Sequence, residues 1–250
     1  MNLAKNWIYE LNKLLALVFC SIALTSCMAQ NELPKVLKVK EIISEEVVTL
    51  SKVSELLEAN TALNKVDLVN WEAFPYRPEV SFRIAHSNNQ IWLKFYVTEE
   101  HILAMRTETN SATHRDSCVE FFIDPEQNGN YYNFEFNCIG VIHLAYGPNI
   151  GKRTFVDPVL IEEQIQVAST LGSVPFEERN GGHAWEMTVI IPASIFIHQS
   201  GISLKELEAN ANFYKCGDDT SKKHYLSWNP VKTERPNFHQ PDYFGRLVFE

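Results

Sequence analysis

The sequence predicts an all-β protein, an antiparallel β-sandwich with one or two short helices. Three observations predict this fold. Apolar and polar residues alternate at period two in many segments, turn-forming residues separate these segments, and only one longer stretch shows helical spacing. There is no internal repeat or low-complexity block. We therefore expect residues 36–250 to form a single domain.

Changes in the spacing of apolar residues predict a strand, a helix and a second strand in the first hundred residues. Residues 36–43 alternate well enough for a strand, and residues 50–59 carry apolar positions at helical spacing, with Ser51 as the candidate cap. Period two returns at residues 91–97, which we expect to form a strand with one core face.

A β-hairpin is predicted over residues 119–138, around the turn signal at residues 124–129. The alternation places six apolar side chains on one face: Val119, Phe121, Ile123, Tyr132, Phe134 and Phe136. The opposite face collects Glu120, Asp124, Asn133, Glu135 and Asn137. Cys138 falls with the apolar set and Cys118 with Glu120, so these two sulfurs should not bond.

Further strands are expected toward the C-terminus, at residues 140–146, 164–170, 185–191, 211–216, 224–228 and 243–249. Residues 192–196 look like one helical turn between two of them.

The N-terminus carries the pattern of a bacterial lipoprotein signal. Lys5 and Lys13 give a positive flank, residues 14–24 an apolar run too short to span a bilayer, and Leu24-Thr25-Ser26 precede Cys27. We expect a signal peptide at residues 1–26, a lipid-modified Cys27 and a tether at residues 27–35. The alternative is a secretory peptide cut after Ala29. Either form predicts export, and lipidation would anchor the protein in the periplasm or on the outer membrane surface.

The negative net charge of the chain limits the classes of molecule that it is expected to bind. The formal net charge is −9, and the 250-residue chain has no basic cluster. An acidic exported protein is a poor candidate for nucleic acid or for anionic lipid surfaces, so contact with a membrane is expected only through the lipid anchor. Cys118, Cys138 and Cys216 remain after the signal region, and a domain of this length does not need a disulfide to fold.

Aromatic, amide and histidine residues concentrate in the C-terminal third, in residues 211–218, 224–230 and 238–245. Such a mixture suits sugars, because aromatic faces stack on the apolar side of a pyranose while polar side chains bond its hydroxyls. Taken one by one, Phe213, Trp228 and Phe244 are better explained as core residues.

Four blocks of the sequence, residues 71–80, 115–122, 131–140 and 212–218, resemble those of carbohydrate-binding module family 9-like proteins. The resemblance implies a DOMON-like β-sandwich that holds a sugar between two tryptophans, for which Trp71 and Trp228 are the nearest candidates, with Arg115 as a hydroxyl ligand. The remaining candidate ligand-binding residues are Tyr214, Lys215, His224 and His239. The expected partner is an oligosaccharide or polysaccharide, bound without cleavage, in support of polysaccharide utilisation.

An enzymatic alternative stays open at this point. Glu120 and Glu135 share one sheet face on neighbouring strands, and a retaining glycoside hydrolase, such as an endo-xylanase, uses two nearby carboxylates. Carboxylates on a β-face are more often solvated or bonded to neighbouring polar groups, which favours binding alone.

No cofactor is expected. Related modules carry structural calcium, for which Asp116, Asp124 and Asn128 could supply oxygens, but no calcium-loop spacing is present. Cys216, Asp218, His224 and His239 match no common zinc spacing, so no metal site is predicted. A haem carrier of the DOMON-like group would need axial ligands that the sequence does not place.

Overall fold

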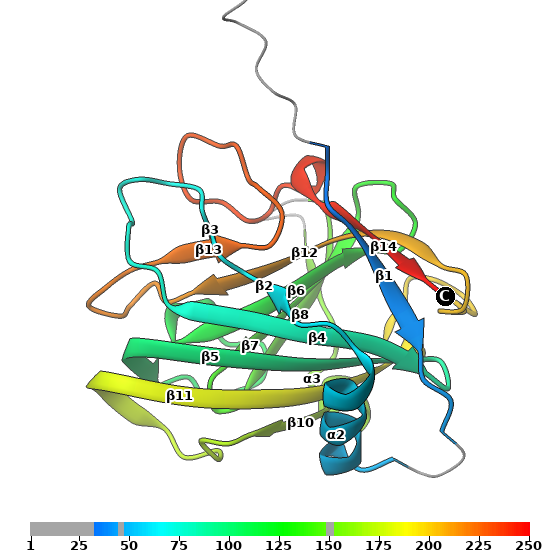
Figure 1. Ribbon diagram of the computed structural model, residues 1–250, viewed down its shortest axis with the longest axis horizontal. Helices are drawn as coiled ribbons and strands as arrows, with labels where there is room; N and C mark the ends of the chain where they lie inside the picture. Colours follow the sequence, from blue (N-terminus) through cyan, green and yellow to red (C-terminus); the bar gives the residue numbers. More distant parts are fainter. Residues whose placement is uncertain (1–32, 45–47, 149–152) are drawn as a thin grey trace, which may run out of the picture. The chain divides into compact units, whose positions relative to one another are not determined.

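Two β-sheets pack against each other in the computed structural model, which describes residues 33–44, 48–148 and 153–250 (Figure 1). Pro34–Glu250 is one compact unit. The expected signal peptide, Cys27 and most of the tether lie outside the described residues. No helix in the described part of the chain is long and apolar enough to cross a membrane.

The first sheet, called sheet B, has the strand order β10-β11-β5-β4, with β2 paired to β4. Its strands are β10 (Gln166–Ser169), β11 (Phe176–Pro192), β5 (Gln90–Ala104), β4 (Glu79–Ser87) and β2 (Asn64–Lys65). The long strands β11, β5 and β4 lie side by side in Figure 1.

The second sheet, called sheet A, has the order β14-β12-β6-β7-β8-β9, and β13 pairs with both β12 and β3. Its strands are β14 (Gly245–Phe249), β12 (Glu208–Cys216), β6 (Cys118–Asp124), β7 (Tyr131–Asn137), β8 (Ile142–Gly147), β9 (Thr154–Phe155), β13 (Tyr225–Ser227) and β3 (Leu68–Val69).

Strand β1 (Val36–Glu41) joins the two sheets and departs from the predicted antiparallel pattern. Val36 to Val39 pair in parallel with β14, and Lys40 and Glu41 pair in parallel with β4. Because one strand serves both sheets, the sandwich is a single curled, mixed sheet, whose other described pairings are antiparallel. The all-β class is confirmed.

The predicted hairpin is confirmed as β6 and β7. Glu120 pairs with Glu135 and Phe121 with Phe134, so the apolar set points into the core between the sheets. Cys118 lies on the opposite face from Cys138, and both thiols are free. The expected polar face is also buried, because segments 112–117 and 228–244 cover it.

Two short helices accompany the sheets. Helix α2 (Leu50–Asn60) begins where the spacing predicts, but its N-cap is Thr49 rather than Ser51, with Oγ1 of Thr49 accepting from the Lys52 amide. Helix α3 (Pro158–Gln164) and strand β4 were not predicted. Three 3-10 turns are present: η1 (Thr113–Arg115), η2 (Ala193–Ile195) and η3 (Pro241–Tyr243).

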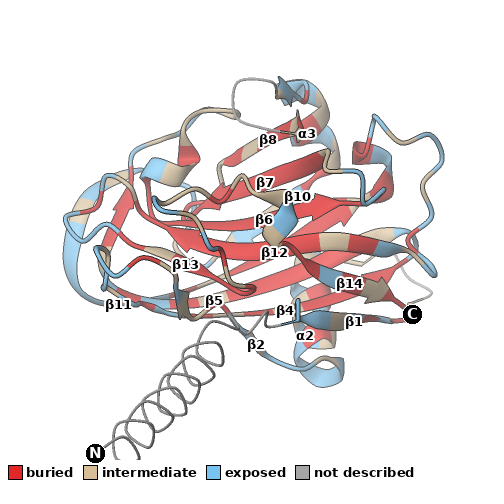
Figure 2. Cartoon of the chain, turned by 90° about the horizontal axis from the view of Figure 1, so that it is seen from above, coloured by how far each residue is buried: buried red, intermediate tan, exposed pale blue. Residues whose placement is uncertain are grey.

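Aromatic rings fill the space between the sheets. Phe82 of β4 stacks on Phe213 of β12 with 3.7 Å between ring centroids, and Phe121 stacks on the other side of Phe213 at 4.9 Å. The buried residues run along the strands of both sheets (Figure 2). Burial of this set is the main stabilising term of the fold.

Candidate functional site

A pocket of about 450 Å³ lies on the face of sheet A that points away from the core. Strands β6, β7 and β12 form its floor, η1 and the turn after β12 form one side, and segment 235–239 forms the other. Its lining comprises His114, Glu120, Glu135, Cys216, Asp218, Tyr225, Arg235, Pro236, Asn237, Phe238 and His239. This volume is within the range of small-molecule sites.

Two buried carboxylic acids face each other on the floor. Glu120 and Glu135 are register partners across β6 and β7, with 2% and 4% of their surface exposed. Burial, followed by the charge of Glu135, raises the pKa of Glu120 well above its ordinary value. Cys216 donates its thiol to Glu120 Oε1 at 2.9 Å. This hydrogen bond lowers the pKa of Glu120, but burial and the charge of Glu135 outweigh it, so Glu120 is the protonated member of the pair.

Glu135 is the ionised member. Burial alone would raise its pKa, but nearby histidines, mainly His143 and His114, outweigh burial and lower the pKa to about 2. Its oxygens accept from Thr113 Oγ1 at 3.1 Å and from Asn133 Nδ2 at 2.7 Å. His114 Nδ1 lies 3.6 Å from the carboxylate, which raises the pKa of His114.

Aromatic side chains form the wall of the pocket. Phe238 stacks on the buried Tyr214 with 4.1 Å between centroids, and Tyr214 donates its hydroxyl to the Phe238 carbonyl. Tyr225 stands at 72° to Phe238, edge-on to Trp71. Tyr225 and Phe238 line the pocket, whereas Tyr214 and Trp71 support them from behind.

His239 is the predicted ligand residue that does line the pocket. Its Nδ1 lies 2.7 Å from the Tyr131 hydroxyl, and burial lowers the pKa of His239 to about 4. The imidazole is therefore neutral at pH 7 and shares a hydrogen bond with the Tyr131 hydroxyl.

The expected tryptophan pair is not an open stacking site. Trp228 is 4% exposed and lies in the main core, edge-on to Phe213 and Phe82. Trp71 is 6% exposed, packs on Phe238 and donates Nε1 to the Thr233 carbonyl. Neither indole ring has a free face, because Trp228 is packed in the core and Trp71 is packed on Phe238.

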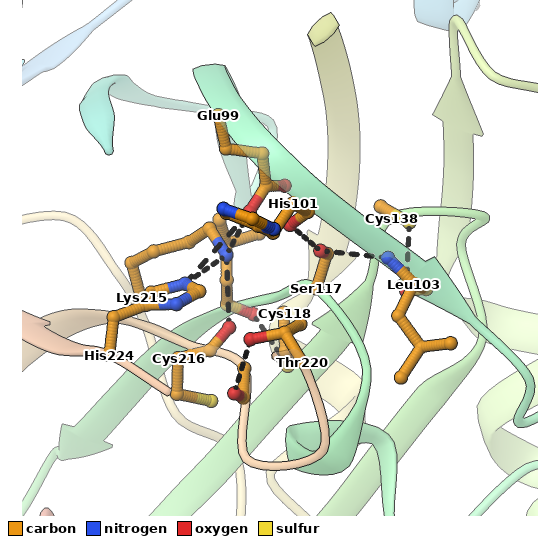
Figure 3. Close-up of polar contacts among 12 residues, drawn as sticks. Glu99, His101, Leu103, Ser117, Cys118, Cys138, Lys215, Cys216, Thr220 and His224 are labelled. Atoms are coloured by element: carbon orange, nitrogen blue, oxygen red, sulfur yellow. Dashed lines mark hydrogen bonds and ion pairs between the residues drawn. The ribbon is translucent and has the colours of Figure 1, made fainter. Parts of the chain in front are cut away.

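Lys215 and His224 also belong to the interior. Lys215 Nζ lies 2.9 Å from Glu99 Oε2 and 2.8 Å from His224 Nε2, and all three side chains are fully buried (Figure 3). Lys215 neighbours Tyr214 and Cys216 on β12 and therefore points to the opposite side of sheet A. These two predicted ligands instead hold the sheets together.

Arg115 and the suggested calcium ligands do not form a site either. The Arg115 side chain is 53% exposed, 3.9 Å from Asp219, and does not line the pocket. Asp116 lies just before β6 and accepts from Met105, Arg106 and Asn137, while Asp124, at the other end of β6, accepts from the Asn128 and Gly129 amides. The three calcium candidates thus do not gather around one point.

A larger hollow of about 610 Å³ lies on sheet B, away from these groups. It has one aromatic side chain, Tyr96, and its Arg77 is paired with Asp67 at 3.0 Å. We favour the smaller pocket as the functional site, because its wall carries two aromatic side chains and its floor carries two buried carboxyl groups.

Sequence reasoning missed most of the pocket lining. His114, Asp218, Tyr225, Arg235, Asn237 and Phe238 were not predicted ligands. The concentration of aromatic and amide residues after position 211 was the correct signal, since seven of the eleven lining residues lie at 218–239. Strand alternation could not decide which ring of that segment faces the pocket.

A two-sheet all-β domain with an aromatic and polar pocket on one sheet face is typical of ligand-binding modules. The model of carbohydrate-binding family 9 matches residues 51–249, and the chain belongs to this family.

Solved structures agree with this assignment. A crystal structure of a proposed carbohydrate-binding protein from Bacteroides uniformis is 40% identical, with a TM-score of 0.83, covering 87% of this chain and 100% of that one. A family 9 module from Caldicellulosiruptor kristjanssonii in complex with glucose is 14% identical (TM-score 0.55), covering 86% and 96%. The module solved with cellotriose is 13% identical (TM-score 0.54), covering 86% and 94%. No curated protein matches the chain.

Proposed function

We propose that the protein binds an oligosaccharide or polysaccharide in the pocket on sheet A, without cleaving it. The observation that carries this proposal is the pocket lining, in which Tyr225 and Phe238 stand beside Asp218, Asn237 and His239. An aromatic ring can cover the apolar face of a pyranose, and amide and carboxylate groups can bond its hydroxyls.

Family membership supports a sugar as the ligand, and the modules solved with glucose and cellotriose suggest which sugars to test first. Stacking would here use Tyr225, the half-buried ring of the pocket wall, in place of the tryptophans, while the more buried Phe238 lines the pocket beside it. A neutral sugar also suits a chain whose net charge is −9.

The test is isothermal titration calorimetry of the full chain with a panel of soluble glucans, xylans and their oligosaccharides. Tyr225→Ala should weaken binding roughly tenfold or more, which corresponds to about 1.4 kcal/mol. Tyr96→Ala is the matched control, because Tyr96 lines the hollow on sheet B. Absence of binding to every glycan at millimolar concentration would refute the proposal. Loss of binding in Tyr96→Ala but not in Tyr225→Ala would show that the sugar binds in the hollow on sheet B.

We further propose that the protein is exported and anchored through Cys27, and that it assists polysaccharide utilisation. Leu24-Thr25-Ser26-Cys27 after an apolar run supports the anchor. Membrane fractionation of the producing cells tests it. Wild-type protein should partition with membranes and the Cys27→Ser variant should not. Equal partitioning of both proteins would contradict anchoring through Cys27.

Hydrolysis is the second candidate function, since Glu120 and Glu135 are paired across two strands and line the same pocket. Assays of wild type and Glu120→Gln on the best-bound glycan separate the two functions. Product formed by the wild type and lost in the variant, with binding retained, would establish hydrolysis.

A further inference from the structure

Two thiols and one carboxyl group meet at and just beneath the pocket floor. Cys118 of β6 and Cys216 of β12 are register partners on adjacent antiparallel strands. Glu120 is two residues beyond Cys118 and therefore points to the same face. The two sulfurs and a carboxylate oxygen all lie within 4.8 Å of one another.

The three groups contact one another directly. Cys216 donates to Glu120 at 2.9 Å and lies 3.4 Å from the His114 carbonyl, and the Cys118 thiol lies beside that of Cys216 and 3.6 Å from the Val119 carbonyl. Burial raises the pKa of all three groups, that of Cys118 to about 12. The ligand atoms of the three groups nevertheless lie within reach of one point, and a divalent cation bound there would favour their ionised forms.

The cluster is also accessible from one side. Cys216 and Glu120 line the pocket, whereas Cys118 lies behind them with no exposed surface. An ion could therefore enter from the pocket and keep one position open toward it. The proposed ion would lie at the pocket floor, beneath Tyr225 and Phe238, so the upper part of the pocket would stay free for a sugar.

We propose that Cys118, Cys216 and Glu120 form a binding site for a divalent metal ion of the zinc class, which goes beyond the proposed sugar binding. Two sulfurs and one carboxylate oxygen are three of the four ligands that tetrahedral zinc prefers, and water from the pocket would complete the set. Binding displaces the two thiol protons and the carboxyl proton to solvent. Thiolate ligation excludes calcium and magnesium, which require oxygen ligands.

This metal site was not predicted from the sequence, because the two cysteines are far apart in the chain and come from separate strands. Zinc spacings recognised from sequence are local. Only the pairing of β6 with β12 brings the sulfurs together.

The experiment is a titration of the reduced, chelator-treated full chain with Co²⁺ and Zn²⁺, without sugar. One equivalent of Co²⁺ should give a thiolate-to-cobalt charge-transfer band that Zn²⁺ abolishes. Cys118→Ser and Cys216→Ser should lose the band, and Glu120→Gln should weaken Co²⁺ binding at least about tenfold. Cys138→Ser is the control, because that thiol faces the Leu103 carbonyl on the core side.

A triple variant, Cys20→Ser with Cys27→Ser and Cys138→Ser, keeps the test decisive if the single variants fail to fold, since it retains only the two proposed thiols. Its band should equal that of the wild type. Absence of the band in the wild type, its loss in the triple variant, or a Cys118–Cys216 disulfide that persists under reductant would each overturn the proposal. Because no sugar is present, these outcomes are independent of the proposed carbohydrate binding.

Discussion

Lys215 of sheet A places its ammonium 2.9 Å from the carboxylate of Glu99 of sheet B, and neither side chain has any exposed surface. Trp185 donates Nε1 to the other Glu99 oxygen at 2.8 Å, and Lys215 also donates to the Cys216 carbonyl. The ion pair is therefore hydrogen-bonded on both sides and ties the sheets together at one end of the core.

Lys215→Met should destabilise the domain by about 3 to 5 kcal/mol, because it leaves the Glu99 carboxylate buried without its cationic partner. Urea unfolding followed by tryptophan fluorescence measures the change. Lys38→Met is the control, since its pair with Glu250 is exposed and should contribute about 1 kcal/mol or less. Equal stability of Lys215→Met and wild type would contradict a structural role for the pair.

Gly245→Ala should destabilise the domain by roughly 1 to 3 kcal/mol. A Cβ at position 245 would lie 2.8 Å from the Lys35 carbonyl and would collide with the Trp228 ring, which is fixed in the core. Gly182→Ala is matched to it, because Gly182 has no atom within 4 Å of the added carbon. The difference between their thermal midpoints tests the close approach of β14 to Trp228, and similar midpoints would count against it.

His239 should make stability fall as the pH is lowered from about 6.5 to about 4. Burial depresses the pKa of His239 to about 4, so within this window the unfolded chain takes up a proton that the folded chain does not. The loss is about 3 kcal/mol and is complete a little below pH 4. Unfolding of wild type and His239→Asn over this range measures it, and parallel pH profiles of the two proteins would refute it.

Trp228→Phe should cost about 1 to 3 kcal/mol of stability but leave sugar affinity per folded molecule within about twofold of wild type. The reason is that Trp228 packs among Phe82 and Phe213 in the core, on the far side of sheet A from the pocket. Calorimetric titration and urea unfolding separate the two effects. A loss of sugar affinity without a loss of stability in Trp228→Phe would show that Trp228 contacts the sugar.

Strand alternation was sufficient to predict one hairpin, β6 and β7, in detail. Phe121 and Phe134 were placed on the core face, and Glu120 and Glu135 on the other, because a period of two fixes the face of every side chain in a paired strand. The same rule explains the separation of Cys118 from Cys138.

The candidate site was less predictable, because the segments that cover sheet A carry no such period. Segment 228–244 buries Glu120 and Glu135, which a two-layer pattern would leave solvated. Lys215 and His224 were expected to bind ligand as polar residues, yet the partner that draws them inward, Glu99, comes from the other sheet. Such long-range charge pairing has no local signature.

Strand β1 makes the two ends of the domain depend on each other. Val36 pairs with Arg246, and Val39 with Phe249, so β1 has no sheet partner on its sheet A side until β14 has been synthesised. Contacts this distant along the chain form slowly and late. Removal of β14 would leave Val36 to Val39 unpaired, and the domain should remain incompletely folded until this strand is available.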